Sequence, residues 1–136
     1  ANGLSQNYTG NDVIVGIVDI GFQTDHPTFY SPDGKKYRIQ RFWNQQKSGN
    51  PPTLYSYGTE YSDSMGIASA IDDDGSHGTH VAGIAAGSGL GSPNLKYRGM
   101  APQSDIVMVG IKYANDPLGV SGLGDYIVAN PTIIDG

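Results

Sequence analysis

The sequence predicts an α/β fold built around a parallel β-sheet. Two segments, residues 13–18 and 106–111, are continuously apolar and rich in β-branched side chains, which is typical of strands buried on both faces in the middle of a parallel sheet. Between them, residues 77–86 have the pattern of a helix that ends at Gly87. Because this helix consists mostly of small residues and is a poor helix in isolation, we expect it to pack very closely against the sheet.

Length and composition exclude several classes of protein. The 136 residues correspond to one domain, at about 150 residues per domain. The formal net charge is -5 and the Lys and Arg residues are scattered, so we expect no nucleic-acid partner. We also expect no membrane partner, because no apolar run is long enough to cross a bilayer, and no signal peptide opens the chain. The absence of Cys excludes disulfides and thiol catalysis but does not identify the compartment.

The first half of the chain is expected to contain two strands and a long loop. The strand over residues 13–18 ends at Asp19, at the position where open α/β sheets bind their ligands; a turn or N-cap role explains this Asp equally well. Residues 37–43 alternate in polarity and predict a half-exposed strand. Residues 44–64 are rich in Gly, Pro, Ser and Tyr and predict a loop insertion, either a small hairpin or a surface loop pinned by Tyr side chains.

The second half begins with an acidic turn at residues 72–76. Its three Asp side chains either are solvated or bind calcium. The predicted helix and the strand over 106–111 follow, and then a glycine-containing loop. Asn130 and Pro131 have the pattern of a helix start, but the chain stops at Gly136. Since so short a helix is not stable alone, we expect the chain to be cut from a longer domain.

Asp19 at a strand end and His77 at a helix start are the residues best suited to catalysis. The positive end of the helix dipole disfavours a charged imidazole, and a neighbouring carboxylate favours it. A histidine under both influences can stay neutral and still accept a proton as a general base. An Asp–His pair is two thirds of a nucleophilic triad. Their separation in sequence does not show whether the side chains meet, so a triad and two unrelated residues both stay open at this point.

The segments around both residues resemble the motifs of the subtilisin-like serine proteases, or subtilases. Residues 15–21 (VGIVDIG) resemble the aspartate motif of that family, and residues 77–83 (HGTHVAG) match its histidine motif at every position. Residues 25–27 (DHP) and 99–102 (GMAP) also follow the order of the family. The resemblance implies a subtilisin-like three-layer α/β fold with a parallel sheet, of which only the N-terminal part is present. Residues 1–136 would then be a partial subtilase catalytic domain.

The resemblance also implies roles for individual residues. Asp19 would be the aspartate of the triad and His77 its general base, while His80 would be a buried structural residue. An alternative interpretation of His77 and His80 as metal ligands lacks a third ligand at a telling spacing, and we predict no metal site. Ser121 and Gly122 lie where subtilases present an edge strand that pairs with the substrate backbone; the alternative there is a flexible glycine loop.

The nucleophile of the family is missing. None of the twelve Ser residues stands in the Gly-Thr-Ser-x-Ala context of the family. The resemblance therefore implies the N-terminal fragment of a serine endopeptidase that hydrolyses peptide bonds through an Asp-His-Ser triad, with no activity of its own. The alternative is a catalytically incomplete pseudoprotease or a binding or structural module. A nucleotide-binding domain is a third interpretation, but residues 19–23 lack the Gly-x-Gly-x-x-Gly turn that it requires.

The implied partners are a peptide or protein substrate and the C-terminal half of the domain. A sheet cut beside residues 13–19 would have an unpaired edge, so a homo-oligomer formed through that edge is also expected. No cofactor is expected. Calcium is left open for the parent protein, although Thr28 stands where some subtilases have a calcium-binding Asp. The family suggests an extracellular or cell-envelope location for the parent.

Overall fold

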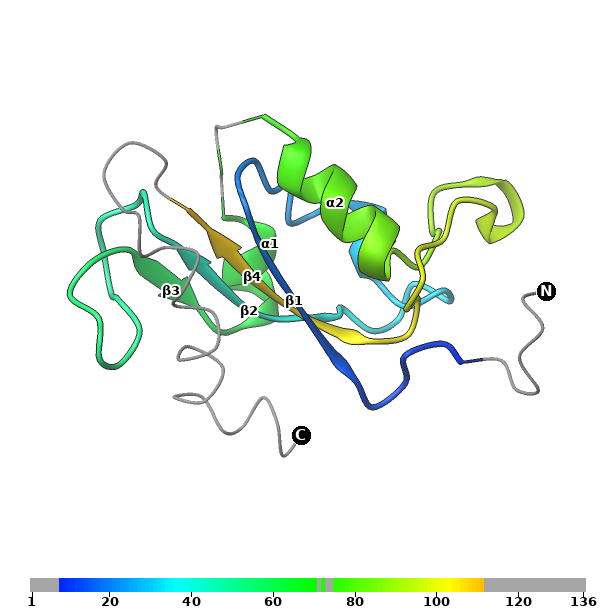
Figure 1. Cartoon of the computed structure of the whole chain (residues 1–136), viewed down its shortest axis with the longest axis horizontal. Coiled ribbons are helices and arrows are strands. Elements are labelled where there is room, and N and C mark those ends of the chain that lie inside the picture. The colour runs from blue at the N-terminus through cyan, green and yellow to red at the C-terminus, as the bar shows by residue number, and fades with distance from the viewer. Residues whose placement is uncertain (1–7, 71, 73–74, 112–136) are drawn as a thin grey trace.

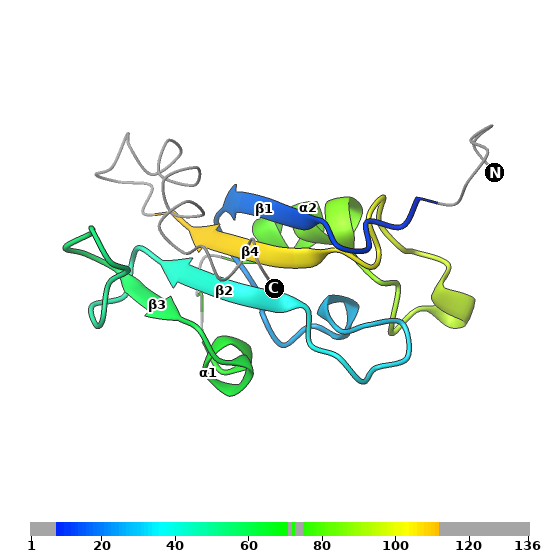
Figure 2. The same ribbon diagram turned by 90° about the horizontal axis from the view of Figure 1, so that it is seen from below.

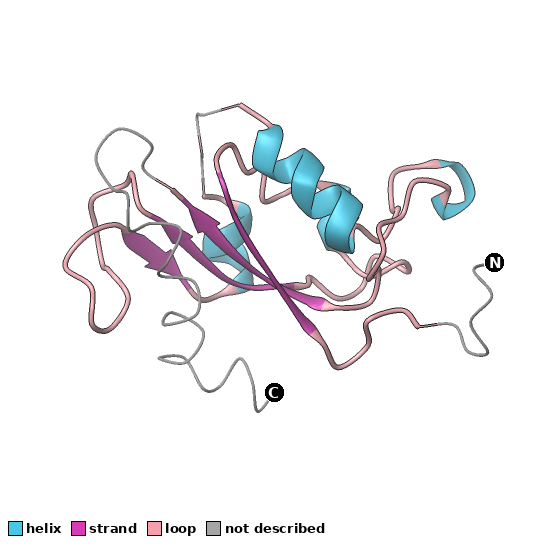
Figure 3. Cartoon of the chain, in the orientation of Figure 1, coloured by secondary structure: helices cyan, strands magenta, loops and turns pink. Residues whose placement is uncertain are grey.

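The computed structural model describes residues 8–70, 72 and 75–111 of the chain. In chain order its elements, with η for a 3-10 helix, are β1 (Ile14–Asp19), η1 (Pro27–Phe29), β2 (Ile39–Asn44), β3 (Thr59–Tyr61), α1 (Ser64–Ala68), α2 (His77–Ala86), η2 (Pro93–Leu95) and β4 (Asp105–Gly110). Figure 1 shows α2 lying along one face of the sheet, and Figure 3 separates helices, strands and loops by colour. Within the described ranges, no helix is long and apolar enough to cross a membrane.

Within the part of the chain that the structure describes, the sheet has four strands in the order β1-β4-β2-β3. β4 is parallel to both β1 and β2, and β3 is antiparallel to β2. Figure 2 shows β1, β4 and β2 side by side with their arrowheads at the same end of the sheet. The predicted α/β class with a parallel sheet is confirmed. The register places the last residues of the three parallel strands, Asp19, Gly110 and Asn44, in one row at this carboxyl edge.

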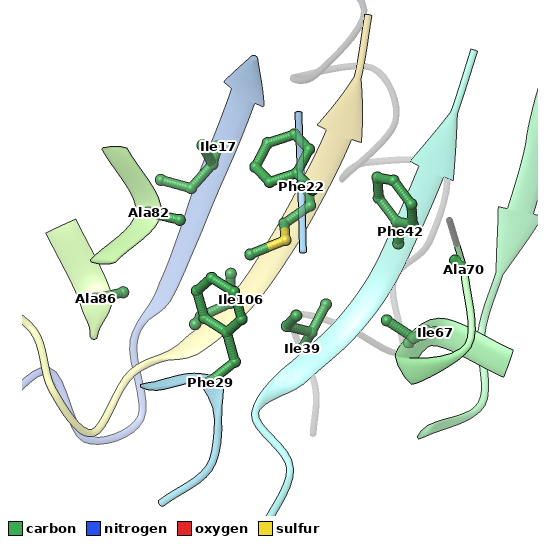
Figure 4. Close-up of a cluster of buried hydrophobic side chains, with 11 residues drawn as sticks. Ile17, Phe22, Phe29, Ile39, Phe42, Ile67, Ala70, Ala82, Ala86 and Ile106 are labelled. Atoms are coloured by element: carbon green, nitrogen blue, oxygen red, sulfur yellow. The ribbon is translucent and has the colours of Figure 1, made fainter. Parts of the chain in front are cut away.

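A core of apolar side chains joins both helices to one face of the sheet, as Figure 4 shows. Ala82 and Ala86 of α2 are fully buried against it, and Ile67 contributes from α1. The side chains that they meet include Ile17, Phe22, Phe42, Ile106 and Met108. Because alanine is the residue at the contact, α2 lies very close to the strands, as its composition predicts. On the opposite face Trp43, Val107 and Val109 form a second cluster.

The bounds of α2 agree with the predicted helix over residues 77–86, but two strands differ from expectation. The apolar pattern of β1 predicts the middle of a sheet, whereas a domain cut beside it predicts an unpaired edge; among the described strands, β1 lies at the end of the order. Ile17 is its one buried residue, and the preceding Val13 is 51 % exposed. β2 was expected to be half-exposed and is buried from Phe42 to Asn44. Both of its faces are packed: Phe42 joins the core on one side, and Trp43 packs with Tyr55 and Tyr57 on the other.

The predicted loop insertion over residues 44–64 contains short elements of its own. β3 pairs with the end of β2, and the loop before β3 folds back so that Tyr55 and Tyr57 lie 4.4 and 5.3 Å from Trp43, between ring centroids. The Tyr-pinned loop is therefore present, and β3 pairs with β2 instead of forming a hairpin from the alternating Tyr residues. The helix α1 was not predicted; Asp63 caps it by accepting a hydrogen bond from the Gly66 N–H at 2.8 Å.

A buried arginine connects η1, the end of α2 and the segment before β4. Arg38, just before β2, is 2 % exposed. Its guanidinium donates hydrogen bonds to the backbone carbonyls of Thr28, Tyr30, Ala86 and Ser104. Burial lowers the pKa of Arg38 from 12.5 to about 10, which still leaves the group charged at neutral pH. No periodicity in the sequence predicts this residue.

Candidate active site

Asp19 and His77, which are distant in sequence, are in direct contact. The Nδ1 atom of His77 lies 2.7 Å from Oδ1 of Asp19. The same Oδ1 accepts a hydrogen bond from the N–H of Ile20 at 2.7 Å. The Asp19 side chain is 15 % exposed, whereas the His77 side chain is 69 % exposed. The pair therefore consists of a sheltered carboxylate at the end of β1 and an imidazole that faces outward.

Backbone hydrogen bonds fix the start of α2 on the turn that follows β1. The N–H groups of Gly78 and Thr79 donate to the carbonyls of Ile20 and Gly21 at 2.6 and 3.1 Å. These donors are among the first N–H groups of the helix, which have no partner inside it. The N-cap residue Ser76 makes no side-chain cap bond. The turn after Asp19 therefore takes over the capping of the helix that carries His77.

Gly78 makes this close approach of helix and turn sterically feasible. A Cβ atom at Gly78 would lie 2.8 Å from the carbonyl oxygen of Ile20 and 2.8 Å from the ring of Phe22. Both distances are shorter than a carbon atom tolerates without movement of the backbone or the ring. Gly78, the first of the two glycines in the HGTHVAG motif, is therefore required for the close approach that brings His77 to Asp19.

Asp72, from the acidic turn before α2, also belongs to this region. Its Oδ2 atom accepts hydrogen bonds from the N–H groups of Gly21 and Phe22 at 3.1 and 3.0 Å. Asp72 is half-buried, while Asp73 and Asp74 lie outside the described residues, so the choice between a solvated turn and a calcium site stays open. Among the described residues no group of three or more His, Cys, Asp or Glu side chains is placed to hold a metal ion.

His80, which the resemblance placed in the interior, is exposed in this chain. It lies on α2 beside a groove of about 740 Å³, whose walls also include Ser76, Thr79, Ile84 and residues 97–100. The expectation of burial is therefore wrong for the described structure. Ser121 and Gly122, predicted to contact substrate, lie outside the described residues.

Comparison with known proteins agrees with these features. The Peptidase S8 (subtilase) family profile matches residues 10–129. The chain is 27 % identical over 129 residues to a PII-type proteinase of Lacticaseibacillus paracasei, covering 90 % of this chain and 7 % of the relative. It is 26 % identical over 125 residues to a C5a peptidase of Streptococcus pyogenes, covering 86 % of this chain and 10 % of the relative.

A solved structure is also similar over most of the chain. The CspB protease of Clostridium perfringens superposes with a TM-score of 0.66 and 26 % sequence identity, over 94 % of this chain and 28 % of that one. The chain thus spans only a small part of each of these relatives. The family profile covers most of its residues, and this protein accordingly belongs to the subtilase family.

Proposed function

We propose that this chain is the N-terminal part of the catalytic domain of a serine endopeptidase, in which Asp19 orients His77 and His77 acts as the general base. The observation that carries the proposal is the 2.7 Å contact between His77 Nδ1 and Asp19 Oδ1. Subtilase membership supports a serine peptidase as the parent. The chain itself holds no serine in the nucleophile motif of the family, so the nucleophile would come from a later part of the parent.

The geometry suits the task of a general base. With Nδ1 bonded to the carboxylate, Nε2 is the nitrogen left to receive a proton from a serine hydroxyl during its attack on a peptide carbonyl. The same nitrogen would then deliver that proton to the leaving amine, and Asp19 would stabilise the imidazolium between the two steps. The exposure of the His77 ring supports this assignment, because a nucleophile and a substrate must both reach it.

The proposal extends to partners and location. The substrate would be a peptide or protein, and the C-terminal half of the domain would cover the open side of β1. We propose an extracellular or cell-envelope location for the parent on the strength of the family. The contact of the substrate with Ser121 and Gly122 stays a prediction, as does the absence of a cofactor. The alternative function is a pseudoprotease or binding module, in which the same pair would be a structural remnant.

The decisive experiment compares variants of the parent protein by labelling with a fluorophosphonate, a reagent specific for activated serines, and by peptide hydrolysis. We expect His77→Ala to reduce turnover on the order of 10⁶-fold and Asp19→Asn on the order of 10⁴-fold, as for other triads of this kind. His80→Gln, an exposed histidine on the same helix, is the matched control and should retain activity.

Three outcomes would contradict the proposal. A wild-type parent that neither reacts with the reagent nor cleaves peptides would favour the pseudoprotease. A His77→Ala variant with wild-type turnover would remove His77 from the mechanism. Stoichiometric labelling of the 136-residue chain alone would show that it carries its own nucleophile.

A further inference from the structure

The turn that follows Asp19 is held from two sides. Its carbonyls at Ile20 and Gly21 accept the first N–H groups of α2, at 2.6 and 3.1 Å. Its amides at Gly21 and Phe22 donate to the single oxygen Oδ2 of Asp72. A peptide segment whose carbonyls and amides are both bonded to other elements has little freedom to rotate. The side-chain bonds to these two amides that the described residues show both come from Asp72.

Both ends of the Asp19–His77 contact depend on that turn. On the carboxylate side, the N–H of Ile20 donates to Asp19 Oδ1 and helps to set its direction. On the imidazole side, the carbonyl of Ile20 receives the N–H of Gly78, the residue next to His77. The peptide between Ile20 and Gly21 carries both the carbonyl that receives the Gly78 N–H and an amide that Asp72 holds, so its rotation would directly disturb the position of the base. Its effect on the acid would pass through the backbone of Ile20, which joins it to the peptide whose N–H bonds Asp19.

The fold leaves space for Asp72 over the carboxyl end of β4. An added Cβ at Gly110 would lie 3.4 Å from Asp72 Oδ2 and 3.3 Å from the ring of Phe42. Gly110 is directly in register with Asp19. The carboxylate of Asp72 thus lies beside the strand end that neighbours the candidate site. Hydrogen bonds from neutral N–H groups to an ionised carboxylate are stronger than those to a neutral acceptor.

We propose that Asp72 is a positioning residue of this site: by holding the amides of Gly21 and Phe22, it keeps Asp19 and His77 within hydrogen-bond distance. The proposal rests on the assignment of His77 as the general base. Asp72 acts through the amides of Gly21 and Phe22, so we expect its effect on the rate of the chemical step rather than on binding. Misplacement of a catalytic group by about 1 Å costs rate on the order of 10²-fold.

The test uses Asp72→Ala and Asp72→Asn in the parent protein, with Asp63→Ala as the matched control. Asp63 likewise accepts a backbone N–H, that of Gly66 at 2.8 Å, but it does so at the start of α1. The fluorophosphonate reaction is resolved into a binding constant and an acylation rate constant. We expect Asp72→Ala to lower the acylation rate constant about 10- to 100-fold while the binding constant stays the same. Asp72→Asn keeps an acceptor oxygen and should recover most of that loss.

A spectroscopic readout separates positioning from stability. The proton that His77 Nδ1 shares with Asp19 gives a low-field resonance in proton NMR, and its absence in His77→Ala identifies it. We expect this resonance in the wild type and in Asp63→Ala, and its loss or broadening in Asp72→Ala, at a temperature where all three proteins are folded. If Asp72→Ala does not fold, Asp72→Asn tests the positioning role instead. We then expect its acylation rate constant to be several-fold lower than that of the wild type and its His77 resonance to be weaker.

The outcomes distinguish the two proposals. If the wild-type parent acylates and the Asp72 variants acylate at the same rate, the positioning role is overturned and the proposed function stands. The positioning role is also overturned if Asp63→Ala and Asp72→Ala lower the acylation rate constant equally. If the wild-type parent does not acylate, the proposed function fails. The His77 resonance then still decides whether Asp72 holds the Asp19–His77 contact.

Discussion

At the scale of single residues, two glycines of α2 have opposite surroundings. Gly78 faces the turn after β1 at a distance that excludes a side chain, whereas a Cβ at Gly83 would meet nothing within 4 Å. We therefore predict that Gly78→Ala destabilises the protein by about 1–3 kcal/mol, the usual cost of forcing an extra methyl group into a packed contact. The free energy of unfolding from urea titration measures this effect.

Gly83→Ala is the matched control on the same helix. Alanine in a helix interior is favoured over glycine by roughly 0.5–1 kcal/mol, so this variant should be more stable than the wild type. If both substitutions lower stability equally, glycine in α2 serves the flexibility of the helix and not the close approach to Ile20 and Phe22.

Tyr37 should make the stability of the protein sensitive to alkaline pH. Burial, followed by the neighbouring Tyr30 and Asp25, raises the pKa of the Tyr37 phenol above its ordinary value of 10.0. The folded protein then keeps a proton that the unfolded chain releases above about pH 10. The resulting stabilisation is complete below that pH and is lost progressively as the pH rises above it.

Tyr37→Phe has no such proton and should lose less stability between neutral pH and the alkaline range. At neutral pH it should be about 1 kcal/mol less stable, because the hydroxyl no longer donates to the carbonyl of Thr24. Urea unfolding titrations at several pH values give both the free energy of unfolding at neutral pH and its change with pH. Tyr97→Phe, on a residue that is 70 % exposed, is the control. If both variants change the pH dependence of the free energy of unfolding equally, the assignment to Tyr37 is wrong.

At the scale of elements, Arg38 joins parts of the chain that no strand pairing connects. Its guanidinium bonds to carbonyls within η1, at the end of α2 and just before β4. Lysine has a single ammonium group and cannot reach all these acceptors in one plane. We predict that Arg38→Lys lowers the free energy of unfolding by about 3 kcal/mol, since buried carbonyls would be left unpaired.

The control for this prediction is Arg98→Lys, at an exposed position. It should change stability by less than about 0.5 kcal/mol. Urea titration of both variants provides the comparison. A small effect at Arg38 would mean that water replaces the guanidinium at these carbonyls.

The elements also show the limits of prediction from sequence. The bounds of α2 and the existence of β1 and β4 follow from hydrophobic patterns that extend over six or more residues. α1 has five residues and β3 has three, too few for a pattern to be distinguished from a loop. Their presence depends on contacts of Tyr61 and Ile67 with a core that other segments build.

At the scale of the whole molecule, the position of β1 at the end of the order of the described strands predicts self-association. The carbonyls of Val13 and Asp19 bond to the β4 side, so the backbone groups of the alternate residue Gly16 point to the open edge. Edges of this kind pair readily with other strands. We expect the isolated chain to show a mass that rises with concentration in sedimentation velocity.

Gly16→Pro removes one N–H group from the open edge without removing a bond to β4, and proline is tolerated at such edge positions. The variant should associate less than the wild type at the same concentration. A wild-type chain that remains monomeric at high concentration would contradict the prediction. Equal association of the two proteins would place the contact elsewhere on the surface.

The sequence by itself determined the family, the α/β class, the helix α2 and the identity of Asp19 and His77 as candidate residues. These properties are local, because a motif or a hydrophobic period is contained in a few consecutive residues. Only the tertiary structure decided that the two side chains meet at 2.7 Å, that Asp72 holds the turn between them, and that His80 is exposed. Each of these depends on how segments far apart in the chain pack against one another, and that packing is a property of the whole fold.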